Sequence, residues 1–93
     1  MDEKITTLHP EGKKGVNISR VKYEQIKSFI LETISCTGAI SYRELNALAK
    51  KQLGPVFKGS VPWYIVTVKL DLEARGIIKR VNQKSGHAIQ LTD

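Results

Sequence analysis

The chain has few of the features that secreted, membrane and catalytic proteins need. It contains one cysteine, Cys36, among 93 residues, so no internal disulfide can form and a reducing cytoplasm is the expected compartment. No apolar run approaches the roughly twenty residues that span a bilayer. The start, MDEKITTLHP, also lacks the apolar core of a signal peptide. We therefore expect neither a membrane segment nor export.

Motifs that carry chemistry are also scarce. The stretch GKKG is followed by Val and Asn, whereas a phosphate-binding loop continues from its second Gly into Lys and then Ser or Thr. His9 and His87 have no zinc-ligand spacing with a cysteine, and no serine stands in a nucleophile elbow. Asp71 and Glu73 are two apart on a predicted helix, so their carboxylates diverge. We expect no catalysis, no bound metal and no cofactor.

The charge balance is basic. Fifteen Lys and Arg stand against nine Asp and Glu, a formal net charge of +6. An excess of this kind favours a polyanionic partner such as DNA, but it also occurs on small domains merely for solubility. The charge alone leaves both interpretations open.

The first predicted helix begins at Ser19, whose hydroxyl can accept from a free amide of the first turn. The Cys-Thr-Gly run 36–38 ends it, and we interpret Cys36 as a small packed thiol. Residues 39–40 are long enough only for a short strand. The apolar stripe of this helix, at the helical period, consists of Tyr23, Ile26, Ile30 and Ile34.

Two more helices follow. The second opens on the capping box SYRE, residues 41–44, and stops at Gly54-Pro55. The third starts at Ser60 with a proline in its first turn, and runs to Arg75, where Gly76 supplies a left-handed stop.

The remaining segments predict two strands and an arm. Residues 77–81 and 87–91 have strand character and flank a turn at 82–86. Residues 1–17 hold one proline and two glycines among charges and are interpreted as an N-terminal arm, either a solvated tail or a minor-groove arm. The fold class is therefore α+β.

Three short helices followed by a hairpin is the order of a winged helix-turn-helix domain. LEARGIIKRV, residues 72–81, resembles the end of a winged-helix recognition helix, its glycine stop and the first wing strand. More loosely, HPEGKKGVNIS and GSVPWYIVTVKLDLEARG resemble an uncharacterised family of small bacterial winged-helix-like proteins. The resemblance implies a winged-helix domain over residues 18–93, with a short strand, a C-terminal two-stranded wing and the arm attached. In such regulators the third helix enters the major groove and the wing lies along the backbone or in the minor groove.

The third helix departs from that pattern. Its core side carries Val61, Ile65, Val68 and Leu72. The opposite side carries Ser60, Trp63, Tyr64, Thr67, Asp71 and Ala74, none of which is the Arg, Lys, Asn or Gln that usually reads bases. Asp71 is expected on this opposite side of the helix, where the phosphates of bound DNA would be near. Between the two sides, Trp63, Val66 and Leu70 form an apolar strip. The core is expected to absorb Val66 and Leu70, whereas Trp63, near the start of the helix, is harder to bury in so small a domain.

Two functional hypotheses follow. The leading one is a winged-helix DNA-binding protein, a small transcriptional regulator that uses backbone-directed contacts, with double-stranded DNA as its partner. Its predicted contact residues are Lys13, Lys14, Lys58, Ser60, Tyr64, Thr67, Lys79, Arg80 and Lys84.

The alternative is a winged-helix protein-protein interaction or dimerisation module with little or no DNA binding. Its predicted interface residues are Trp63, Tyr64, Val66 and Leu70. A homodimer that binds DNA would satisfy both hypotheses. Strand alternation sends Lys79 and Arg80 to opposite faces, so at most one is expected to face a ligand.

Overall fold

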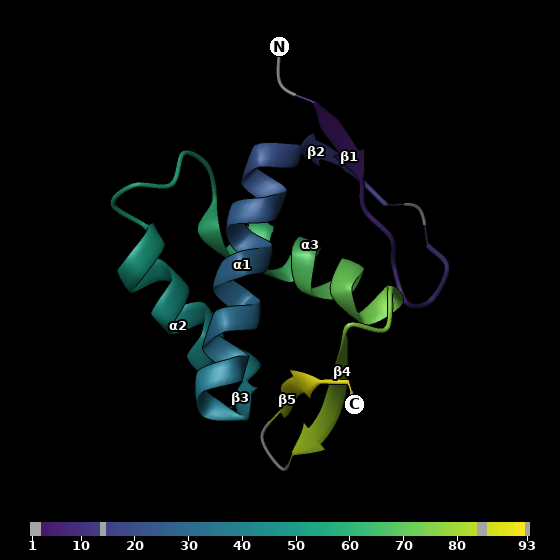
Figure 1. Ribbon diagram of the computed structural model, residues 1–93, viewed down its shortest axis with the longest axis vertical. Helices are drawn as coiled ribbons and strands as arrows, with labels where there is room; N and C mark the ends of the chain where they lie inside the picture. Colours follow the sequence, from purple (N-terminus) through teal and green to yellow (C-terminus); the bar gives the residue numbers. More distant parts are fainter. Residues whose placement is uncertain (1–2, 14, 84–85, 93) are drawn as a thin grey trace.

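The computed structural model describes residues 3–13, 15–83 and 86–92. These residues form an α+β structure with three helices and two small antiparallel sheets (Figure 1). No helix among them is both long and apolar enough to cross a membrane. The elements are β1 Lys4–Thr6, β2 Asn17–Ser19, α1 Arg20–Thr37, β3 Ala39–Ser41, α2 Tyr42–Leu53, α3 Val61–Ala74, β4 Ile78–Gln83 and β5 Gly86–Leu91.

Local signals set the helix ends, as predicted. Each helix starts after a serine whose side-chain oxygen accepts from a first-turn amide, which satisfies one of the donors that a helix leaves free. Gly38 and Gly76, with φ of 83° and 76°, follow α1 and α3 in the left-handed conformation that glycine adopts without strain. The capping serines are Ser19, Ser41 and Ser60, which accept from the amides of Lys22, Glu44 and Trp63.

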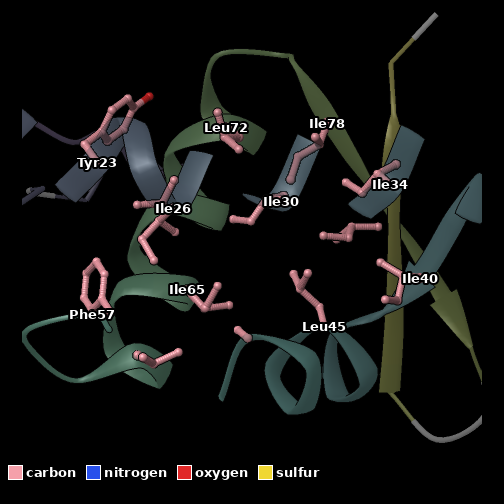
Figure 2. Packing of buried hydrophobic residues seen from close by; sticks show 14 of the residues in the cluster. Tyr23, Ile26, Ile30, Ile34, Ile40, Leu45, Phe57, Ile65, Leu72 and Ile78 are labelled. Carbon is pink, nitrogen blue, oxygen red and sulfur yellow. The ribbon is translucent and has the colours of Figure 1, made fainter. Parts of the chain in front are cut away.

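The core lies between the three helices and one face of the C-terminal hairpin. The predicted stripe of α1 and the predicted core side of α3 are both buried, because each repeats at the helical period. Cys36, expected to be packed, is instead exposed, since it lies away from the buried stripe of α1. Figure 2 shows side chains from all three helices pointing toward one another, among them Ile26, Ile30, Ile34, Leu45, Ile65 and Leu72.

The C-terminal sheet has the strand order β3-β5-β4, with every pair antiparallel. Ile40 of β3 faces Ile89 of β5, and the β4–β5 ladder runs from Ile78 opposite Leu91 to Gln83 opposite Gly86. The predicted turn at 82–86 was too long, because the ladder continues through its outer residues. This order is compatible with the expected winged helix.

The predicted N-terminal arm is folded against the rest of the chain. β1 pairs with β2, and beyond them the amide of Thr7 donates to the carbonyl of Val16 at 2.8 Å. The amide of Val16 in turn donates to Thr7 Oγ1 at 3.0 Å. Gly15 permits this closure, since a Cβ there would lie 1.7 Å from the Thr7 carbonyl oxygen. Residues 3–13 and 15–19 therefore form an N-terminal hairpin, which is neither a frayed tail nor a free arm.

Candidate binding surface around the third helix

Helix α3 is covered on three sides. Its core side packs on α1 and α2, and two further sides are closed by buried ionic contacts, one centred on Asp71 and the other on Lys69. The N-terminal hairpin loop runs beside the C-terminal half of the helix (Figure 1). The surface that remains for a partner is therefore a narrow strip along the helix.

The Asp71 side corrects the sequence prediction. Asp71 was expected to face phosphates, yet it is fully buried. One carboxylate oxygen accepts from the Leu8 amide at 2.8 Å, and the other accepts from Arg75 Nε at 2.8 Å and from the Tyr23 hydroxyl. Burial and the bond to Asp71 raise the pKa of Tyr23 far above its ordinary value, so the phenol stays a donor. The carboxylate holds the N-terminal hairpin, α1 and α3 together, and it carries no exposed charge.

The side of α3 that lies opposite Asp71 holds a second buried ion pair. Lys69 Nζ lies 2.9 Å from Glu73 Oε2, and the two side chains are almost fully buried. The ammonium also lies 5.4 Å from the centroid of the Tyr42 ring, which stacks on His87 of β5. Burial first, and then the nearby cations Lys69 and Arg80, lower the pKa of His87. These contacts join α3 to α2 and to the C-terminal hairpin, so neither charge of the pair is presented to a ligand.

The remaining surface is the outer strip, which we define as Trp63, Val66 and Leu70. Trp63 is 43% exposed, and Val66 and Leu70 are half-buried without belonging to the core cluster. The expectation that the core absorbs Val66 and Leu70 is therefore wrong. Tyr64 turns inward, edge-on to Phe57 at 5.0 Å and to Trp63 at 4.9 Å. Of the four predicted interface residues, Tyr64 is the one that packs on the core.

A hollow of about 130 Å³ adjoins the outer strip. The N-terminal hairpin forms one wall of it and α3 the other. None of the lining residues that the structure describes is Lys, Arg, Asp or Glu. They are Thr7, Leu8, His9, Gly15, Val16, Trp63, Thr67 and Leu70.

The predicted DNA-contacting residues are spread over several elements. Lys58 and Ser60 are exposed at the start of α3, and Lys79 and Arg80 are both exposed on β4. Lys13 is exposed but lies 3.4 Å from Glu11, and Arg80 contacts His87 Nδ1 at 3.3 Å. Thr67 is half-buried beside the hollow, and Tyr64 is half-buried against the core. Lys14 and Lys84 lie outside the described residues.

Sequence reasoning missed the hairpin side of the hollow. Leu8 and Val16 were assigned to an arm, although KIT and NIS are short alternating segments that a loop can bring together. No sequence signal shows that Leu8 reaches Asp71, because the two are 63 positions apart.

Comparison with known proteins identifies a family whose function is unknown. Residues 4–88 match the model of a family of unknown function, DUF6958, and the chain belongs to that family. The match begins in β1 and ends in β5, so it spans the N-terminal hairpin together with the three helices. No curated protein and no solved structure matches the chain.

Proposed function

We propose that the protein is a winged-helix domain that binds the backbone of double-stranded DNA without reading base sequence, as a small transcriptional regulator in the cytoplasm. The observation that carries this proposal is the topology. A short strand between the first two helices joins a hairpin in the order β3-β5-β4, and α3 leads through Gly76 directly into β4. In winged helices this arrangement places the third helix and the wing on one DNA-facing side.

The electrostatics of α3 support backbone binding. Asp71 and Glu73, the two acids of α3, are each within 3 Å of a cation and largely withdrawn from solvent. The exposed basic residues near the helix start and on β4 therefore face no exposed acid from α3. The amide groups at Ser60 add the positive end of a helix, which favours a phosphate.

The same helix argues against base readout. The outer strip offers an indole and two aliphatic side chains, which cannot form the paired hydrogen bonds that distinguish bases in the major groove. Among the described residues we therefore assign the DNA contacts to Lys58, Ser60 and Lys79, because Arg80 follows Lys79 on β4, projects from the other face of the strand and contacts His87. Such contacts position a protein on the duplex without specifying sequence.

Fluorescence anisotropy with two unrelated 20-bp duplexes tests this proposal. Affinities for the two duplexes should agree within about threefold. If four or five phosphates are contacted, log affinity should fall with log salt at a slope of about −4. Lys79→Ala should weaken binding to both duplexes and reduce the slope by about 1.

The matched control is Lys50→Ala, which removes the same charge from an exposed site in the last turn of α2. It should keep the wild-type slope within error. No binding at 50 mM salt and 100 µM protein, or equal losses in the two variants, would contradict the proposal.

The second candidate function is a protein-interaction or dimerisation module. It is favoured by the outer strip and by the neutral hollow beside it, since apolar surface of this kind is more typical of protein interfaces than of groove readers. The wing is separate from the outer strip, but Trp63 of the strip lies in the first turn of α3 beside Ser60, so the two candidate functions share the start of this helix. The absence of catalysis stays a prediction from the sequence.

A further inference from the structure

The two most exposed large apolar side chains of the described residues meet at one pocket. Val56 is 71% exposed and Val21 is 65% exposed. Both line a pocket of about 230 Å³ between the start of α1 and the connection from α2 to α3, which comes back toward α1 (Figure 1). Large apolar groups exposed together around a concavity are the usual mark of an interaction site.

The wall of this pocket that the α2–α3 connection forms is fixed in place. The amides of Val56 and Phe57 both donate to the carbonyl of Leu53, at 3.0 and 2.7 Å, so the connection is tied to the last residue of α2. The Phe57 ring is buried and packs edge-on against Tyr64 of α3. A preformed surface loses little conformational entropy when it binds a partner.

Two lysines, Lys22 and Lys58, make the pocket positively charged. The Lys22 ammonium lies 5.6 Å from the centroid of the Tyr64 ring and 6.0 Å from that of Phe57, and these cation–π contacts hold it at the pocket. Neither lysine forms an ion pair with a described acid. The other lining residues that the structure describes are neutral: Ser19, Val21, Gln25, Val56 and Phe57.

We propose that this pocket binds an acidic segment of another protein, with one aliphatic side chain of the partner in the pocket and its carboxylates beside Lys22 and Lys58. The proposal goes beyond the proposed DNA binding and does not require it. The two share only Lys58. The surface also differs from the outer strip, none of whose residues lines the pocket.

Size and charge favour this occupant over the alternatives. The volume exceeds the roughly 150 Å³ of a cavity that binds benzene but is below the roughly 300 Å³ at which small-molecule pockets begin, so it suits one side chain. The phosphates of DNA would pair with the lysines but leave the two valines in a polar contact. A second copy carries the same +6 charge and is repelled. An acidic segment with an aliphatic side chain complements both the charge and the apolar lining.

An NMR titration of the full ¹⁵N-labelled chain tests the proposal. The probe is a capped peptide with one leucine between two runs of three glutamates. Saturable shifts should collect at the amides of residues 19–25 and 56–58. The dissociation constant should be on the order of 1 mM at 50 mM salt, because one buried side chain and two exposed charge pairs contribute little more. Replacing the leucine by alanine, or the glutamates by glutamine, should each weaken binding at least threefold.

Variants of the chain locate the contact. Val56→Glu removes apolar surface and places an acid beside the lysines, so it should weaken peptide binding more than fivefold. Val81→Glu makes the same change on an exposed valine of β4 outside the pocket, and should alter binding less than twofold. Lys58→Ala should weaken binding about two- to fivefold, whereas Lys50→Ala, at an exposed site outside the pocket, should leave it unchanged. Circular dichroism confirms that each variant is folded.

The proposal is overturned if the wild type shows no saturable shift up to 5 mM peptide, or if the peptide with alanine binds as well as the one with leucine. Equal losses in Val56→Glu and Val81→Glu would overturn it too. Lys79→Ala, which should weaken DNA binding, should bind the peptide as tightly as the wild type. Peptide binding by a chain that binds no duplex would remove the DNA proposal and leave this inference standing, and the converse result would do the opposite.

Discussion

Replacing Asp71 by alanine should separate the N-terminal hairpin from the helices. The carboxylate is fully buried and accepts from the Leu8 amide, the Tyr23 hydroxyl and the Arg75 guanidinium. Alanine leaves the amide and the phenol without a partner. Arg75 can turn to water, because its side chain is already 35% exposed.

The expected cost is about 3–5 kcal/mol, the range found when one partner of a buried charged pair is removed. Hydrogen bonds to a charged group contribute about 1.5–3 kcal/mol each. The contributions of several hydrogen bonds to one carboxylate do not add, so the loss should not exceed this range. A chain of this length has a total stability of about 5–14 kcal/mol. The melting temperature should therefore fall by at least about 12 °C.

Urea unfolding followed by circular dichroism measures this cost, with Glu32→Ala, an exposed acid on α1, as the control. Tyr23→Phe completes a double-mutant cycle, in which the two losses should couple by more than 0.5 kcal/mol. Hydrogen exchange at the Leu8 amide should become fast in Asp71→Ala while the α1 amides stay protected. A loss below about 1 kcal/mol would refute the reasoning, because it would mean that the buried carboxylate contributes no more than a surface charge.

Two further predictions concern the C-terminal and N-terminal hairpins. The pKa of His87 is lowered by burial and by nearby Lys69 and Arg80, so the unfolded chain binds more protons than the native one below about pH 6.5. The urea midpoint should therefore decrease as the pH is lowered from 7.5 to 5.5, and this decrease should be smaller in His87→Gln. An equal decrease in the variant and the wild type would be evidence against the prediction. Gly15→Ala should open the N-terminal hairpin at a cost of about 1–3 kcal/mol, because the added Cβ clashes with the Thr7 carbonyl. The Thr7 amide should then exchange its hydrogen faster. A Thr7 amide that stays protected from exchange would contradict the predicted clash.

The helices were predictable because their signals are local. A capping serine acts on an amide three residues away, and an apolar stripe repeats within four residues. Gly76 marks the end of α3 for the same reason. The C-terminal strands were predicted with their ends short by one or two residues. The polar residues of the outer ladder, such as Asn82, resemble a turn until their pairing partners are known.

The binding surface was predictable only in part. Trp63, Val66 and Leu70 were identified as an apolar strip from their angular positions on α3. The expectation that the core absorbs Val66 and Leu70 was wrong, because the structure leaves both outside the core cluster. The same helical wheel placed Asp71 on the exposed side, which was wrong. A helical wheel divides residues by angle, but it does not show which angles another segment covers.

What the sequence determines by itself is the set of elements: three capped helices, a glycine stop after the third, and a C-terminal hairpin. Each depends on side chains within a few positions of one another, so no knowledge of the rest of the chain is needed. What only the tertiary structure decided is the character of the surface around α3. Leu8 meets Asp71 across 63 residues, and that contact converts an arm into a hairpin, hides an acid and builds the apolar hollow. Contacts of such long range depend on how the finished elements pack, which no local pattern encodes.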